Sequence, residues 1–120
     1  MKIKRYEIKE SVSKDDLLAA GAVTDGNKML IMKYITIGNS DFRIVLTFDS
    51  FKKSKVKSWN DIDNVCVEDT DSGTRYKLFR VFQRCNEDVP KGGALYDIAT
   101  AYHQLMGSLP FMAVREGADD

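Results

Sequence analysis

The chain has 120 residues, with 18 basic and 18 acidic side chains and a formal net charge of zero. This length fits one domain, and 43% hydrophobic and 30% charged residues are too apolar a mixture for a disordered chain. A net charge of zero lacks the basic excess of a dedicated nucleic-acid binder and the acidic excess of a DNA mimic. It is still compatible with one basic face and one acidic face on the same molecule. We therefore expect a single domain over residues 1–120, with a frayed acidic tail at 115–120.

The opening stretch and the cysteines predict the compartment of the protein. Residues 1–10 have no apolar core of the kind found in signal peptides, and every apolar run is shorter than the roughly 20 residues of a membrane helix. Cys66 and Cys85 form neither a CxxC pair nor a disulfide framework, so we expect two reduced thiols. These features predict a cytoplasmic protein, made by a bacterium or by an element within one.

The first elements expected are a strand and a short helix. Apolar and charged residues alternate over 2–9, which predicts a strand with one wet face at a sheet edge. Ser13 is a good N-cap for a helix of two turns, and Gly21 suits its C-terminal end. Such a short helix needs tertiary packing, so we expect Leu17 and Leu18 to contact a sheet.

A hairpin is expected next. Residues 24–27 are typical of a turn, and 29–37 form an apolar run on both faces that predicts a central strand. Residues 38–41 suit a hairpin connection. The strand over 42–49 alternates most clearly, and its period of two places four side chains on the core, Phe42, Ile44, Leu46 and Phe48.

The second half begins with a basic connection and ends with a long helix. Residues 60–64 suit a turn between the connection at 51–59 and a strand that starts at Val65. The turn at 69–73 then returns the chain as a strand over 74–82.

Apolar residues recur at three- and four-residue spacing over 94–109, which predicts a helix. The order of elements indicates an α+β fold. We expect a largely antiparallel sheet of about five strands, with a short N-terminal helix and a longer C-terminal helix packed on one face.

The residues give little sign of catalysis. His103 has no second histidine to complete a zinc site, and we expect a solvated helix residue there. No GxSxG nucleophile setting occurs. Residues 69–73 resemble the start of a calcium loop but lack its later glutamate, so a plain hairpin turn is favoured. We therefore expect no catalytic residue, no metal and no cofactor.

The basic residues of the second half are the strongest functional candidate. If the two basic stretches adjoin, they form a positive surface with aromatic side chains between the charges, which suits nucleic acid or an acidic protein partner. A solvated face balanced by nearby acids is the alternative. A single Trp can cap the edge of a core or serve as an interface anchor. The candidate partner-binding residues are Lys52, Lys53, Lys55, Lys57, Trp59, Arg75, Lys77 and Arg80.

Three stretches share a pattern with one group of proteins: residues 59–69 with Gly73, Tyr76 and Phe79 after them, residues 5–8, and a closing Tyr102, Met106 and Leu109. The pattern resembles that of small uncharacterised accessory proteins of bacteriophages and integrated mobile elements of Gram-positive bacteria. This group has no settled activity, so the resemblance assigns no catalytic residue. It implies a setting in which many small proteins bind and disable a host component, such as a CRISPR effector or another defence factor.

We therefore expect a non-enzymatic binding protein of a phage or mobile element that blocks a host protein. Two alternatives stay open. One is a nucleic-acid-binding regulatory module, whose affinity would fall steeply with salt. The other is an oligomer that sequesters a nucleotide near Lys91 and the glycine pair that follows it, ahead of the C-terminal helix.

Overall fold

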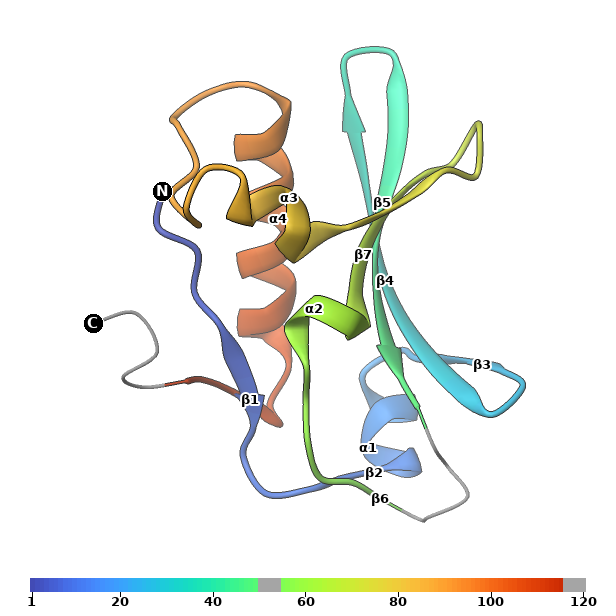
Figure 1. The fold of residues 1–120 in the computed structure, drawn as a ribbon. Coiled ribbons are helices and arrows are strands. Elements are labelled where there is room, and N and C mark those ends of the chain that lie inside the picture. Colours follow the sequence, from blue (N-terminus) through green and yellow to red (C-terminus); the bar gives the residue numbers. More distant parts are fainter. Residues whose placement is uncertain (50–54, 116–120) are drawn as a thin grey trace.

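The computed structural model of the protein describes residues 1–49 and 55–115 and shows an α+β fold (Figure 1). Its main sheet has five strands, and every neighbouring pair is antiparallel. The strands lie in the order β3 (Val23–Asp25), β4 (Lys28–Ile37), β5 (Ser40–Phe48), β7 (Val65–Asp69) and β8 (Arg75–Lys77). The predicted fold class is confirmed, including the short N-terminal and the longer C-terminal helix.

The helices are α1 (Lys14–Ala19), α2 (Asp61–Asn64), α3 (Leu78–Gln83) and α4 (Ala94–Ser108). Figure 1 shows α2, α3 and α4 on the same side of the main sheet. The helix α4 buries one stripe against it, made of Ile98, Ala99, Ala101, Tyr102, Leu105 and Met106. In the described part of the chain, no helix is long and apolar enough to cross a bilayer.

The strand β5 follows the predicted alternation. Ile44, Leu46 and Phe48 are buried in the core, and Phe42 packs against it from the partly buried rim. The predicted hairpin is also present, because β4 and β5 pair from Ile37 and Ser40 onward.

The strand β4 is central only over its first residues. Its pairing with β3 ends at Leu30, so the prediction of a central strand over 29–37 is wrong for the later residues. An apolar run on both faces predicts burial but does not show which strands lie beside it.

The N-terminal strand does not join the main sheet. The strand β1 (Tyr6–Ile8) pairs with β9 (Met112–Val114) in a separate two-stranded sheet, so the expected place at a sheet edge is confirmed, although this is not the main sheet. Tyr6 and Ile8 are both buried, and the C-terminal segment supplies the backbone partners that the sequence pattern could not identify. A second small sheet pairs β2 (Val12–Ser13) with β6 (Lys55–Val56).

The helix α1 begins as the sequence predicts. The Ser13 hydroxyl accepts from the Asp16 N–H at 3.1 Å, and the Asp16 carboxylate accepts from the Ser13 N–H at 2.9 Å. Leu17 is fully buried, whereas Leu18 is 47% exposed, so the expected sheet contact of Leu18 is wrong. Successive helical residues point about 100° apart, and a six-residue helix can bury only one narrow face.

The expected strand over 74–82 is wrong after its first residues. The chain leaves β8 at Lys77 and forms α3, which fully buries Leu78, Phe79 and Phe82. These three positions suit both an alternating and a helical pattern, since 78 and 82 lie four residues apart. Arg80 therefore lies exposed on a helix rather than on a strand.

Residues 61–64 form the single turn α2 in place of the expected turn at 60–64. The Asn60 side-chain oxygen caps this turn, since it accepts from the Ile62 and Asp63 N–H groups at 3.0 and 3.4 Å.

Candidate functional site

One face of the main sheet carries no helix of the described chain (Figure 1). We call this surface the open face. Cross-strand register places its side chains in rows, because residues directly opposite each other share a face. It is formed by Val23, Asp25, Lys28, Leu30, Met32, Tyr34, Thr36, Asp41, Arg43, Val45, Thr47, Cys66, Glu68, Arg75 and Lys77.

A charged row crosses the open face. The Glu68 carboxylate lies between two guanidinium groups, with Arg43 Nη2 at 2.6 Å and Arg75 Nε on its other oxygen. The hydrogen bond from Arg75 lowers the pKa of the Glu68 carboxyl, and the charge of Arg43 adds to this effect. This row therefore holds a fixed carboxylate between two cations.

The neighbours of Arg43 complete the row. Its Nη1 lies 3.4 Å from the Tyr34 hydroxyl and 3.3 Å from Met32 Sδ. Its Nε is buried and has no hydrogen-bond partner among the residues that the structure describes. Arg43 is thus held in place by packing as well as by charge, and it contacts the hydroxyl of Tyr34.

Apolar side chains lie beside the charged row. Tyr34 is 64% exposed and Val23 is 46% exposed, whereas Leu30 and Met32 are half-buried. Val45 lies fully buried between its cross-strand neighbours, although it is not part of the main core. A partly apolar sheet face without a covering layer is typical of an interaction surface. The sequence carries a signal for this surface, because Leu30, Met32 and Tyr34 form a second apolar set that alternates with the core-facing residues of 29–37.

The predicted basic residues fall into separate groups. Lys52 and Lys53 lie outside the described residues. Lys55 belongs to β6 and Lys57 follows it, beside β2. The other three basic candidates belong to β8 and α3, and two of them, Arg75 and Lys77, are on the open face.

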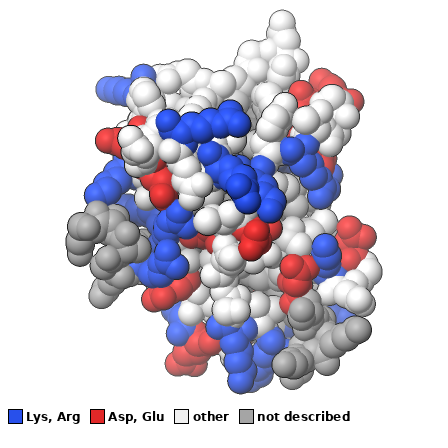
Figure 2. Space-filling view, in the orientation of Figure 1, with Lys and Arg blue, Asp and Glu red and all other residues white. Residues whose placement is uncertain are grey.

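Figure 2 shows basic and acidic side chains interspersed on the face in view. Arg75 pairs with Glu68, and Lys77 Nζ lies 3.4 Å from Asp63 Oδ1. Part of the predicted positive charge is therefore balanced locally, and exposed pairs of this kind contribute little to stability. Partner binding by the eight candidates stays a prediction.

Trp59 lies at the edge of the core. Its ring packs on Phe48 with 4.9 Å between ring centroids and 36° between ring planes. Its indole N–H donates to Asp61 Oδ1 at 2.5 Å. Asp61 is only 3% exposed, and burial raises the pKa of its carboxyl. Trp59 thus satisfies a buried acid, which gives it a structural role whether or not it contacts a partner.

Arg5 is the centre of a second polar cluster. Its guanidinium makes two hydrogen bonds to the Glu87 carboxylate, at 3.0 and 3.1 Å. The same group lies 4.7 Å from the centroid of the Phe79 ring, and its Nη1 is 3.8 Å from Asp61 Oδ2. The cluster ties the N-terminal segment to the turn after α3 and to α2.

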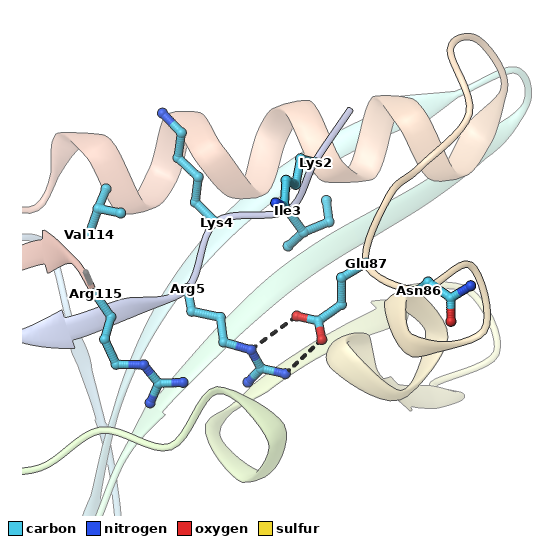
Figure 3. Close-up of a pocket in the computed structure, with 8 residues that line it drawn as sticks. All are labelled: Lys2, Ile3, Lys4, Arg5, Asn86, Glu87, Val114 and Arg115. Carbon is cyan, nitrogen blue, oxygen red and sulfur yellow. Dashed lines mark hydrogen bonds and ion pairs between the residues drawn. The ribbon is translucent and has the colours of Figure 1, made fainter. Parts of the chain in front are cut away.

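A pocket of about 200 Å³ lies against this cluster. Figure 3 shows the Arg5 and Arg115 side chains extending to the same side of the N-terminal segment, with Glu87 reaching toward Arg5. Four basic residues and one acidic residue line the pocket, together with Ile3, Asn86 and Val114; the charged ones are Lys2, Lys4, Arg5, Arg115 and Glu87.

The backbone beside the pocket is held in an unusual conformation. Asn86 and Glu87 have φ angles of 55° and 57°, which cost about 1 kcal/mol or more each for residues with a side chain. The Glu87 carbonyl accepts from the Ile3 N–H at 2.8 Å, and the Arg115 N–H donates to the Arg5 carbonyl at 2.9 Å. Arg115 is therefore bonded to the fold, whereas the remainder of the predicted tail, 116–120, lies outside the described residues.

His103 differs from its prediction as a solvated residue. It is half-buried, and its Nε2 accepts from the Lys4 N–H at 3.1 Å. Burial lowers the pKa of His103, and the nearby charge of Lys4 lowers it further. The neutral imidazole is the form that can accept this bond, so His103 fastens the N-terminal segment to α4.

The predicted turn at 69–73 is present. Asp69 Oδ1 accepts from the Asp71 and Ser72 N–H groups at 2.9 and 3.3 Å, and Gly73 adopts a φ of 74°. Among the described residues, no group of three or more His, Cys, Asp or Glu side chains could hold a metal ion. The two cysteines are free thiols. Gly93 caps the N-terminus of α4 without a side-chain bond, directly after Lys91 and Gly92.

No protein-family model matches the sequence, and neither a curated protein nor a solved structure matches it.

Proposed function

We propose that this chain is a non-enzymatic binding protein that docks on a partner protein through the open face. The observation that carries the proposal is an uncovered sheet face with an exposed Tyr34 and Val23 beside the half-buried Leu30 and Met32. Aromatic and aliphatic side chains of this kind supply the buried centre of protein interfaces. The non-enzymatic part of the proposal has a second support. Asp61 and His103 flank the core and have shifted pKa values, and both make hydrogen bonds that hold the fold together.

The charges of the open face favour a partner whose rim carries charges of both signs. Arg43, Arg75 and Lys77 share this part of the face with two acids, Glu68 and Asp41. Asp63 of α2 pairs with Lys77 and balances the remaining positive charge. Complementary charge at a rim speeds association and selects the partner, while the apolar side chains of the open face supply affinity.

The proposed partner is a host protein, and the proposed effect is to block it. The support for this step is the resemblance to accessory proteins of phages and mobile elements, whose neighbours disable CRISPR effectors and other defence factors. Occupation of a partner surface requires no chemistry from this chain, only a stable complex.

Two matched double variants test which of the predicted basic residues contact the partner. Arg75→Gln with Lys77→Gln removes two charges from the open face, and Lys55→Gln with Lys57→Gln removes two charges from the small β2–β6 sheet. All four side chains are exposed, so we expect both variants to fold. The tagged chain is used to isolate a stoichiometric host partner, which is then purified and titrated with each variant by calorimetry.

We expect the open-face variant to weaken binding about ten-fold or more, and the β2–β6 variant to bind as the natural chain does. Equal affinity of both variants for the partner, or loss of binding only in the β2–β6 variant, would contradict docking through the open face. Failure of any stoichiometric partner to co-purify would contradict the proposed function itself.

A nucleic-acid-binding module is the second candidate, and the pocket beside Arg5 is the observation that favours it. Four basic side chains line this pocket against one acid, which suits a phosphate group. A gel-shift series with single-stranded DNA and RNA at two ionic strengths tests it. Affinity that falls steeply with salt supports this candidate, and absent or salt-independent binding removes it.

A further inference from the structure

The outer edge of β4 is unpaired over most of its length. Its pairing with β3 ends at the pair Val23 and Leu30, and β4 continues to Ile37. Within residues 1–49 and 55–115, no strand pairs with residues 31–37 on that side. Figure 1 shows the far end of the β4–β5 hairpin extending beyond the rest of the sheet. An exposed strand edge is a template for the backbone of another strand.

The direction of the backbone groups follows from the hairpin. A two-residue loop, Gly38-Asn39, joins β4 to β5, so Ile37 and Ser40 exchange backbone hydrogen bonds. The direction of the backbone N–H and C=O groups alternates from one residue of a strand to the next. Ile31, Lys33, Ile35 and Ile37 therefore direct these groups to β5. Met32, Tyr34 and Thr36 direct their N–H and C=O groups to the open edge.

This edge lacks the usual protection. Exposed edges are normally blunted by proline, by bulges or by several charges. Residues 31–37 contain neither proline nor glycine, and Lys33 is their single charge. The pairing of β4 with β5 is continuous, without a bulge. The edge is thus seven residues long, regular and largely apolar.

We propose that a second copy of this chain pairs with this edge in antiparallel register, with Tyr34 at the two-fold axis. Tyr34 is the middle residue of 31–37, so this register uses the whole unpaired stretch in both copies. It places Tyr34 opposite Tyr34, Lys33 opposite Ile35 and Ile31 opposite Ile37 of the second copy. No like charges then face each other directly, and the zero net charge adds no long-range repulsion.

Other occupants and registers fit less well. A register centred on Lys33 sets two ammonium groups directly opposite each other, which is unfavourable. The Tyr34 register instead pairs two exposed rings on the same face, and aromatic cross-strand pairs stabilise a sheet. It joins the open faces of the two copies into one continuous surface. The pairing does not depend on the proposed function.

Charge variants at the two-fold axis provide the test. Sedimentation equilibrium of the natural chain should show a dimer of twice the 13.6 kDa chain mass. Tyr34→Lys and Tyr34→Glu each place like charges opposite each other, and we expect each variant to dimerise about ten-fold more weakly or not at all. An equal mixture of the two variants should dimerise again, because Lys then faces Glu.

Two controls separate pairing from folding. Tyr76→Lys changes an exposed tyrosine on β8, at the opposite edge of the sheet, and should leave the dimer intact. Thr36→Pro removes one outward N–H. Circular dichroism should show this variant to be folded, because edge strands tolerate proline where the N–H is unpaired, and sedimentation should show it to be a monomer. A natural chain that stays monomeric, a dimer that both Tyr34 variants preserve, or a mixture that fails to dimerise would each overturn the proposal.

Discussion

Replacement of Trp59 tests whether this residue stabilises the fold or forms part of a binding surface. Trp59→Phe keeps an aromatic ring against Phe48 but removes the indole N–H that donates to Asp61. Hydrogen bonds to charged groups contribute about 1.5–3 kcal/mol, and the loss leaves a buried carboxylate with one donor fewer. We therefore expect Trp59→Phe to lower the free energy of unfolding by about 2 kcal/mol, and the melting temperature by about 8 °C.

A double-mutant cycle assigns this loss to the bond with Asp61. Asp61→Asn converts a charge-assisted bond into a neutral one of roughly half the strength. In that background, Trp59→Phe should cost only about 1 kcal/mol, which gives a coupling of about 1 kcal/mol between the two sites. Trp59→Ala removes the contact with Phe48 as well and should cost about 3 kcal/mol.

Urea unfolding followed by far-ultraviolet circular dichroism measures these values. Fluorescence is unsuitable, because Trp59 is the single tryptophan of the chain. If Trp59→Phe changes the unfolding free energy by less than about 0.5 kcal/mol, the range typical of surface substitutions, Trp59 does not stabilise the fold through this bond. An unchanged cost of Trp59→Phe in the Asp61→Asn background would likewise show that the bond contributes nothing.

The other predictions concern two matched leucines and one histidine. Leu17→Ala should lower the unfolding free energy by about 3 kcal/mol and Leu18→Ala by less than about 0.5 kcal/mol, as urea titrations can measure, because only Leu17 is buried. The lowered pKa of His103 means that the unfolded chain binds more protons as pH falls below about 6.5, so stability should decline there. His103→Gln should flatten this dependence between pH 7 and 5, and an unchanged slope would show that His103 is not the group responsible.

The sequence predicts best where one physical signal acts alone. In β5, alternation with a period of two decides which side chains are buried, and Ile44, Leu46 and Phe48 lie in the core as expected. Ser13 predicts the start of α1 because a side-chain cap acts within four residues of chain. Such local signals do not depend on which elements lie nearby.

Prediction fails where distant segments decide the structure. Leu78 and Phe82 are compatible with a strand and with a helix, and only burial against β7 and α4 selects the helix α3. The partner of β1 is the C-terminal β9, more than 100 residues away, and no local pattern identifies it. In both cases tertiary contacts override the preference of the segment.

The candidate site was predicted in part, for the same reason. Composition shows that basic residues cluster along the second half of the chain, but their surroundings depend on strand register. Arg75 lies opposite Glu68 because β7 and β8 pair in one particular register, and a shift by one residue would place Arg75 on the other face. Basic residues in the sequence therefore do not by themselves define a positive surface.

The residues that sequence reasoning missed share one property. Leu30, Met32 and Tyr34 alternate with the core-facing residues of β4, and in the sequence they look like the second face of a buried strand. An apolar second face needs a covering layer, and the described chain supplies none over this part of the sheet. Since apolar side chains gain free energy when they leave water, a partner or a second copy that covers this face supplies the burial that the fold omits. The exposed Tyr34 belongs to both proposed surfaces, so Tyr34→Lys should weaken the dimer and partner binding together. The variant that lacks Arg75 and Lys77 separates the two, because it should weaken partner binding and leave the dimer intact.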